Sequence, residues 1–241
     1  MKVVAIVQAR MGSTRLPGKV LMDIAGKTML ERVVERVCAA RRIDEVVVAT
    51  STAPSDDAIV ALCDALGVRW FRGSEEDVLD RYHGAALEAA ADVVVRVTSD
   101  CPLIEPGIID RVVDALQTQP DLDFAANTLE PRTFPRGLDV EAMRMAALET
   151  TCREAQHASE REHVTPFIWQ QPKRFKLGRV CHDTDLSALR WTVDTPEDLA
   201  FVRAIFEHLP ARAFAWGEVL RLLDAKPELT RINAGITQKP L

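Results

Sequence analysis

Residues 3–19 read VVAIVQARMGSTRLPGK, a short apolar run that leads at once into a polar loop. The continuous apolar run over 3–7 predicts a strand that is buried on both faces of a parallel sheet. Arg10, Arg15 and Lys19 follow it, with two glycines among them. Glycine lets backbone N–H groups approach an anion closely, while arginine and lysine neutralise phosphate oxygens. The stretch therefore predicts a buried first strand followed by a phosphate-binding loop.

Short apolar runs alternate with amphipathic stretches along the rest of the chain, which is typical of a mostly parallel sheet covered by helices. The pattern predicts strands over 3–7, 45–49, 68–71, 92–97, 124–126, 138–141, 174–181 and 189–192. It predicts helices over 28–40, 55–66, 76–90, 106–116, 143–154, 160–170 and 196–208. We expect an α/β fold, a three-layer α/β/α sandwich with a Rossmann-like sheet. Residues 238–241 are expected to be a loose end.

The composition excludes several classes of protein. The formal net charge of −6 argues against a sequence-independent nucleic-acid binder. No apolar stretch approaches the length that a bilayer requires, and the first apolar run is too short for a signal peptide. The five cysteines are scattered, which favours reduced thiols. We expect a cytoplasmic protein with neither nucleic acid nor membrane as a partner.

Polar segments follow four of the predicted strands. Ligands of open parallel sheets bind beyond the carboxyl ends of the strands. That rule selects residues 8–19, 50–55, 98–102 and the segment that follows 190–193. These segments are where the chemistry is expected.

The run over 7–19 resembles the signature loop of sugar cytidylyltransferases, the enzymes that make CMP-activated ketodeoxyoctonate and sialic acids. It is most similar to the branch named for spore coat polysaccharide biosynthesis. The loop is not a P-loop, because Val20 follows Lys19 where Ser or Thr is required. The resemblance implies that the nucleotide and its phosphates are held by Ala9, Arg10, Gly12, Ser13, Arg15 and Lys19, of which Arg10, Arg15 and Lys19 would also serve catalysis.

Residues 72–82 resemble the segment of this family that lies along the base and ribose. The resemblance implies nucleotide contacts from Arg72, Ser74, Asp77 and Arg81. A local alternative is a helix N-terminus with Ser74 as its cap and acidic residues placed against the helix dipole.

Two further segments resemble the metal-binding segments of the family. Thr98 and Asp100 lie in the turn over 98–103, where Thr98 would contact the nucleotide and Asp100 would bind a metal ion and serve catalysis. Asp194 lies in the second segment, over 190–199. Mg²⁺ usually takes one or two carboxylates together with substrate phosphates, so Asp100 and Asp194 suit it. The local alternatives are a polar turn and a helix cap.

Two other segments match the spore-coat branch and would face the acceptor. Asp139 and Glu141 alternate with apolar residues, which puts both carboxylates on one face of the predicted strand over 138–141. Glu162 and His163 belong to a polar segment further on. The alternatives are a solvated strand face and a structural histidine.

The resemblance as a whole implies a Mg²⁺-dependent nucleotidyltransferase. It would transfer CMP from CTP to an acidic, sugar-like acceptor with release of pyrophosphate, in surface polysaccharide biosynthesis. The fold would be of the nucleotide-diphospho-sugar transferase type, with a small dimerisation and acceptor arm, in a homodimer. The single domain over 1–241 would comprise a nucleotide-binding half (1–120), an acceptor and dimerisation region (121–190), and the second metal segment with C-terminal helices (191–241).

Two other functions are consistent with the same sequence. A nucleotide-sugar-dependent glycosyltransferase would need a pair of metal-binding acids, and Asp183 and Asp185 have the spacing. A non-catalytic nucleotide-binding protein is the other alternative. The loop cations interact with phosphates and do not select the base, so specificity for another nucleotide also remains open.

Overall fold

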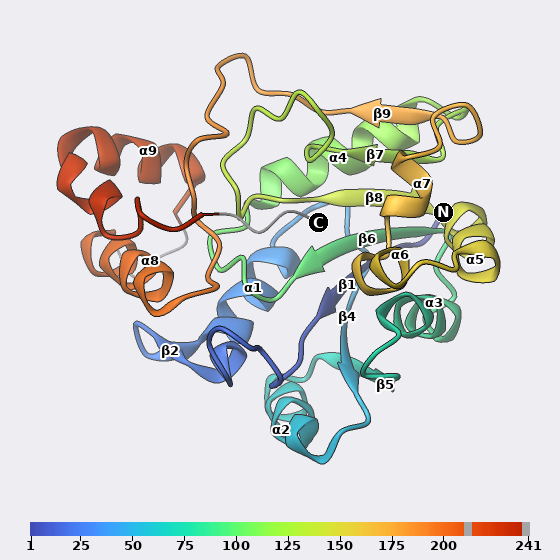
Figure 1. Cartoon of the computed structure of the whole chain (residues 1–241), viewed down its shortest axis with the longest axis horizontal. Coiled ribbons are helices and arrows are strands. Elements are labelled where there is room, and N and C mark those ends of the chain that lie inside the picture. Colours follow the sequence, from blue (N-terminus) through green and yellow to red (C-terminus); the bar gives the residue numbers. More distant parts are fainter. Residues whose placement is uncertain (210–213, 238–241) are drawn as a thin grey trace.

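The computed structural model describes residues 1–209 and 214–237. Within those ranges, one sheet has seven strands in the order β5-β4-β1-β6-β8-β7-β9. Their bounds are β1 Val3–Gln8, β4 Glu45–Ser51, β5 Arg69–Gly73, β6 Val93–Thr98, β7 Phe124–Ala126, β8 Glu141–Arg144 and β9 Leu177–Arg179. β8 is antiparallel to both of its neighbours, and every other pairing in this sheet is parallel. The expected mostly parallel sheet is confirmed (Figure 1).

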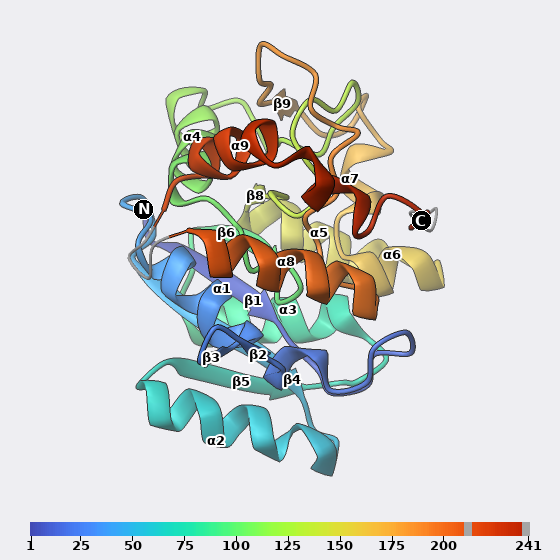
Figure 2. The ribbon, with the colours of Figure 1, turned by 90° about the vertical axis from the view of Figure 1, so that its left-hand side faces the viewer.

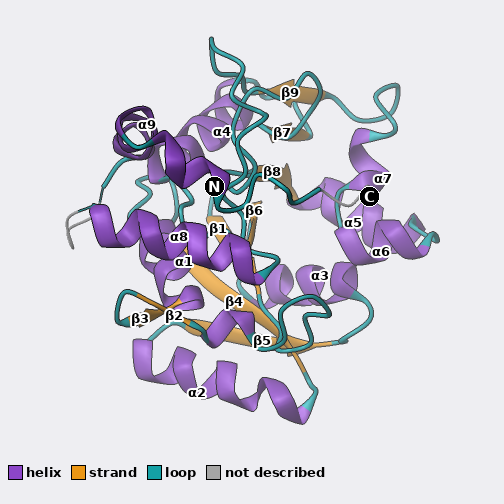
Figure 3. Ribbon diagram, turned by 60° about the vertical axis from the view of Figure 1, so that its left-hand side comes forward, coloured by secondary structure: helices purple, strands orange, loops and turns teal. Residues whose placement is uncertain are grey.

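Helices cover both faces of this sheet and complete the expected three layers (Figures 2 and 3). One face packs against α1 Met29–Cys38, α2 Asp57–Leu66, α4 Pro106–Thr118, α8 Pro196–His208 and α9 Trp216–Ala225. The other face packs against α3 Val78–Glu88, α5 Met145–Glu154 and α7 Pro166–Trp169, and α6 Ala158–His163 lies against α3. Among the helices in the described part of the chain, none is both long and apolar enough to cross a membrane.

The predicted signals explain where several of these helices begin and end. Thr28 caps α1, and its side chain accepts a hydrogen bond from the backbone of Glu31. Gly67 ends α2 in the left-handed conformation. α8 has the predicted bounds. Its start is fixed by a capping box between Thr195 and Asp198, with Pro196 at the first helical position.

The strand predicted over 138–141 is wrong, and β8 begins at Glu141 instead. The side-chain amide of Asn127 bonds to the carbonyl of Leu138 and to the N–H of Val140, at 2.7 and 2.8 Å. Because a side chain takes these backbone partners, residues 138–140 do not join the ladder. Asp139 therefore lies in a loop, and strand alternation does not place it beside Glu141.

Other predicted elements are shorter or interrupted. The helix predicted over 160–170 breaks at Val164 into α6 and α7, because Pro166 cannot donate the helical hydrogen bond. The strand predicted over 189–192 is reduced to one bridge between Arg190 and Arg136. The helices predicted from 76 and 143 begin at 78 and 145, and the strand predicted over 174–181 spans only 177–179.

Some short elements were not predicted. They are a hairpin, β2 Asp23–Ile24 with β3 Lys27–Thr28, and three 3-10 turns, η1 Lys19–Leu21, η2 Pro54–Asp56 and η3 Pro227–Arg231. The prediction for 238–241 lies outside the described residues.

The loop that follows β1 is fastened to the neighbouring strand by Asp56. This carboxylate is 1% exposed. It accepts the N–H of Met11 at 2.8 Å and the hydroxyls of Ser51 and Thr50 at 2.6 and 3.1 Å. Burial alone would raise the pKa of Asp56, but these hydrogen bonds together outweigh it and lower the pKa below its ordinary value.

We expect Asp56→Asn to change the acid sensitivity of folding. A depressed folded-state pKa stabilises the protein above the unfolded-state pKa of about 3.9, and that stabilisation is lost as the pH falls through the folded value. The wild type should therefore be more stable than the variant near neutrality, and the difference should shrink below about pH 4. Urea unfolding from pH 7 to pH 3 measures this. A difference that stays constant over that range would contradict the assignment.

Gly137 lies where two loops meet backbone to backbone. Its φ is +102°, and a Cβ there would lie 2.6 Å from the backbone nitrogen of Thr192. Hydrogen bonds join the neighbouring Arg136 to Leu189 and Trp191. This contact holds the segment before β8 against the segment before α8.

The variant Gly137→Ala should destabilise the fold more than Gly26→Ala. Gly26 also has a positive φ, of +82°, but a Cβ there would meet nothing within 4 Å, so its variant measures the backbone cost alone. We expect the added backbone clash at Gly137 to cost roughly 1–3 kcal/mol more. Urea midpoints at an unchanged m-value give the comparison. Equal losses in the two variants would show that the close approach is absent.

Candidate functional site

The carboxyl ends of β1 and β6 open into a polar cavity of about 560 Å³, which we call the loop cavity. Its walls come from the loop after β1, the turn after β6, the start of α3 and the segment before α8. The charged side chains that line it include Arg10, Arg15, Lys19, Arg81, Asp100 and Asp194. It therefore brings together segments that are far apart in the sequence.

Lys19 lies at the point where three of these segments meet. Its Nζ is 2.9 Å from Oδ2 of Asp100, 3.0 Å from Oδ1 of Asp194 and 2.7 Å from the carbonyl of Val193. Burial by itself would lower the pKa of Lys19, but the two carboxylates outweigh it and raise the pKa. Burial by itself would raise the pKa of Asp100. The charge of Lys19 and the hydrogen bonds from Thr98 and Lys19 outweigh burial and lower the pKa. The shifts of Lys19 and Asp100 both favour the charged form of each group.

A second cluster fixes the orientation of Asp194. Its Oδ2 lies 2.9 Å from Arg15 and 3.0 Å from Arg190. Arg190 in turn pairs with Asp198, which is fully buried and also accepts hydrogen bonds from Asn233 and from the backbone of Asp194. Asp198 thus holds both the arginine and the backbone that present Asp194 to the cavity.

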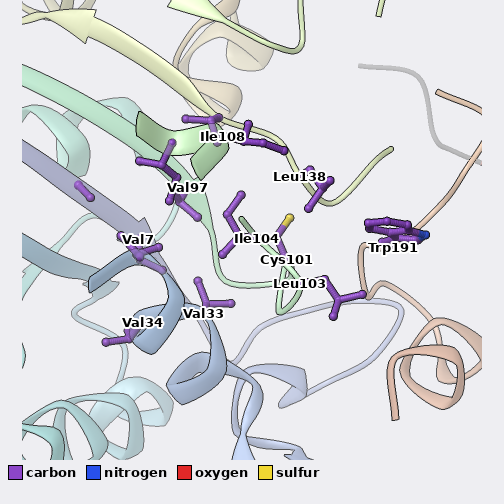
Figure 4. Close-up of a cluster of buried hydrophobic side chains, with 14 of the residues drawn as sticks. Val7, Val33, Val34, Val97, Cys101, Leu103, Ile104, Ile108, Leu138 and Trp191 are labelled. Carbon is purple, nitrogen blue, oxygen red and sulfur yellow. The ribbon is translucent and has the colours of Figure 1, made fainter. Parts of the chain in front are cut away.

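Asp100 is positioned by an apolar core directly beneath it. The following residue, Cys101, is buried among side chains that include Leu103, Leu138 and Trp191 (Figure 4). The backbone carbonyl of Asp100 accepts the N–H of Val193 at 2.8 Å. The core and this hydrogen bond hold Asp100 close to the segment that carries Asp194.

A second cavity, of about 710 Å³, adjoins the first, and we call it the side cavity. It lies over the start of β8, and its lining includes Thr128, Arg132, Glu141, Thr165 and Trp169. The two cavities share the lining residues Arg96, Thr98, Arg136, Asp139 and His163. The two cavities therefore lie side by side across this shared wall.

His163 is partly buried in this wall. Burial is the largest cause that lowers its pKa below the usual value, and the charge of Arg96 acts in the same direction. Glu162 and Glu141 oppose this shift without reversing it. A neutral imidazole can accept a hydrogen bond from a bound hydroxyl.

Most of the residues selected from the sequence lie at this site. The loop cavity is lined by Ala9, Arg10, Ser13, Arg15, Lys19, Arg81, Thr98, Asp100, Asp139, Glu162, His163 and Asp194, and Glu141 lines the side cavity. Gly12, Arg72, Ser74 and Asp77 are not among the described residues that line either cavity. The loop after β1, the turn after β6, the segment before α8 and the end of α6 therefore lie together around these cavities.

The segment over 72–77 has structural partners instead. Arg72 donates to the carbonyls of Ser51 and Ala53, and it faces a separate hollow beside β5. Ser74 does not cap α3. The cap is Asp77, which accepts the N–H of Asp80 at 2.9 Å and pairs with Arg161 at 2.7 Å.

Two arginines of the shared wall were not among the site residues selected from the sequence. Arg96 lies in the strand that was read as wholly apolar, and Arg136 directly precedes Gly137. A charged residue inside a buried apolar run is rarely tolerated without a partner, so Arg96 itself was the available signal.

The exposed pair Asp183 and Asp185 lies elsewhere. Neither residue is among the described residues that line the two cavities. This placement gives no support to a glycosyltransferase with these acids as its metal ligands.

Comparison with known proteins agrees with this geometry. Residues 4–213 match the family described as Cytidylyltransferase. An uncharacterized protein of Methanocaldococcus jannaschii is 35% identical over 241 residues, 99% of this chain and 97% of that protein. The Spore coat polysaccharide biosynthesis protein SpsF of Bacillus subtilis is 33% identical over 232 residues, 92% of this chain and 94% of that protein.

A solved structure shows the same fold over the whole chain. The cytidylyltransferase from Leptospira borgpetersenii is 33% identical, covers 100% of this chain and 99% of its own, and superposes with a TM-score of 0.92. The family match and the extent of these similarities identify this chain as a nucleotidyltransferase of the cytidylyltransferase family.

Proposed function

We propose that this enzyme transfers CMP from CTP to an acidic, sugar-like acceptor, with release of pyrophosphate. The observation that carries the proposal is the convergence of Arg10, Arg15 and Lys19 with Asp100 and Asp194 in one cavity that shares a wall with a second. The family supports CTP as the donor. The name of the Bacillus subtilis relative supports a place in surface polysaccharide biosynthesis.

The loop cavity suits a nucleoside triphosphate. Within the described residues, Arg10 has no side-chain hydrogen bond or ion pair, so its guanidinium is available to phosphate oxygens. Arg15 and Lys19 neutralise carboxylates and can also offset charge on the phosphates and on the departing pyrophosphate. Arg81 lines the same cavity and would contact the base.

The donor set fits Mg²⁺. Asp100 and Asp194 approach one Lys19 nitrogen from two segments, so their oxygens lie close together. Each carboxylate has about four lone-pair sites, and the contacts to Lys19, Thr98 and the arginines leave some of them open. When bound, the ion would polarise the α-phosphate. The chain's own residues position the substrates and carry the remaining charge.

The side cavity suits the acceptor. An acceptor hydroxyl oxygen would attack the α-phosphorus in line, forming a P–O bond as the bond to pyrophosphate breaks. Asp139 and His163 lie in the wall between the cavities, where each can accept a hydrogen bond from that hydroxyl. Glu162 lies at the rim of the loop cavity, where it can contact an acceptor. The work of the protein is chiefly positioning and electrostatics.

Pyrophosphate release tests the activity directly. The enzyme should be incubated with Mg²⁺, each of the four nucleoside triphosphates, and a panel of sugar acids, sugar phosphates and phosphonates. We expect release that depends on both CTP and one class of acceptor. Equal release from all four triphosphates would contradict the base specificity, and free nucleotide from a nucleotide sugar would support a glycosyltransferase.

The variant Asp100→Asn should retain the fold and lose turnover. Removing one carboxylate that fits the metal should cost several kcal/mol of barrier, which is a loss of kcat of about a hundredfold or more. The matched control is Asp185→Asn, an exposed residue outside both cavities, and it should turn over like the wild type. Near-normal kcat in Asp100→Asn would remove Asp100 from the mechanism.

A further inference from the structure

Arg96 is a charged residue in an apolar strand, and it lies where the two cavities meet. It belongs to β6, between Val95 and Val97, and it lines both cavities. Its Nη1 donates to Oε2 of Glu141 at 2.8 Å. Its Nε is buried and has no partner among the described residues. A guanidinium has five N–H donors, so the protein leaves part of this group unsatisfied at the shared wall.

Glu141 is occupied by donors from the protein. Its Oε2 accepts from Arg96, and its Oε1 accepts the hydroxyls of Thr128 and Thr165, both at 3.1 Å. The residue is 6% exposed. Burial therefore restricts the access of a ligand to this carboxylate, and both of its oxygens already have donors from the protein. It is instead well placed to fix the direction of the Arg96 guanidinium.

A strained turn supplies one of those donors. Val164 has φ 71° and ψ −54°, a conformation that a β-branched residue rarely adopts. The N–H of Thr165 donates to the carbonyl of His163 at 2.8 Å, which closes a three-residue γ-turn. The turn directs the Thr165 hydroxyl onto Glu141 while His163 lines both cavities. Strain of this kind persists where the surroundings require the geometry.

We propose that Glu141 is a positioning residue that holds Arg96 at the shared wall, and that Arg96 binds the α-phosphate of the nucleotide during transfer. The inference rests on the proposed function, because in-line attack places the α-phosphate between the acceptor and the pyrophosphate. Arg96 would then offset the charge that develops on the α-phosphoryl oxygens. Glu141 acts through Arg96 and does not contact the acceptor.

A double-mutant cycle tests this chain of action. The variants are Arg96→Met, Glu141→Gln and the double variant. Two readouts are kcat for pyrophosphate release and the calorimetric affinities for CMP, which carries the α-phosphate, and for cytidine, which lacks it. Each single variant should lower kcat by about a hundredfold with a small change in the KM for CTP. Each should lower the affinity for CMP and leave the affinity for cytidine unchanged. In the double variant, the losses of kcat and of CMP affinity should be no larger than in either single variant.

Two further variants keep the test decisive. Glu154→Gln, at the end of α5, removes two surface ion pairs, with Arg153 and with Arg174, and should behave as the wild type. Thr165→Val removes one donor to Glu141 without leaving a buried charge, and it should give a smaller loss of the same kind. If Glu141→Gln does not fold, Thr165→Val becomes the test of the proposal. A kcat and a CMP affinity equal to those of the wild type in that variant would overturn the proposal.

The outcomes separate this proposal from the proposed function. Additive losses in the double variant would show that Glu141 contacts a substrate independently and would overturn it. If the wild type is active and Arg96→Met has the same kcat, the proposal about Arg96 is overturned and the proposed function remains intact. Selective loss of CMP affinity in an enzyme that releases no pyrophosphate would support it and reject the proposed function. If the wild type neither binds CMP nor releases pyrophosphate, both this inference and the proposed function are rejected.

Discussion

The site depends on one buried ammonium group between two carboxylates. Asp100 and Asp194 come from separate segments and would repel each other at this separation, and Lys19 compensates both at 2.9 and 3.0 Å. Burying these charges is costly unless they are paired and hydrogen-bonded, so the three segments must meet for any of them to be stable there. The loop after β1, the turn after β6 and the segment before α8 are thereby brought to one point.

Buried carboxylates in this protein divide into two kinds. Asp56, Glu141 and Asp198 are at most 6% exposed, and each accepts several hydrogen bonds from the protein. Each one fixes a loop or an arginine beside the cavities. Asp100 and Asp194 have more exposed side chains, at 24% and 13%. The first kind holds the architecture, and the second remains accessible to a ligand.

Local signals in the sequence were sufficient for much of the fold. The apolar run over 3–7 predicted the buried first strand, and Thr195, Pro196 and Asp198 predicted α8 because caps act within one turn. The position of the loop cations after that strand predicted the edge of the sheet where they lie. Resemblance to a family, and not local pattern, selected Asp100 and Asp194.

Long-range contacts account for what was missed. Arg96 was hidden in an apolar run because its partner, Glu141, lies 45 residues away. The strand over 138–141 was misplaced because Asn127 takes the backbone partners of Leu138 and Val140. No local pattern reports either pairing. For evolution, the reversed direction of β8 has its own consequence. The connection before β8 enters the sheet at the cavities, so substitutions among its cavity-lining residues would reshape the side cavity and leave the cations after β1 in place.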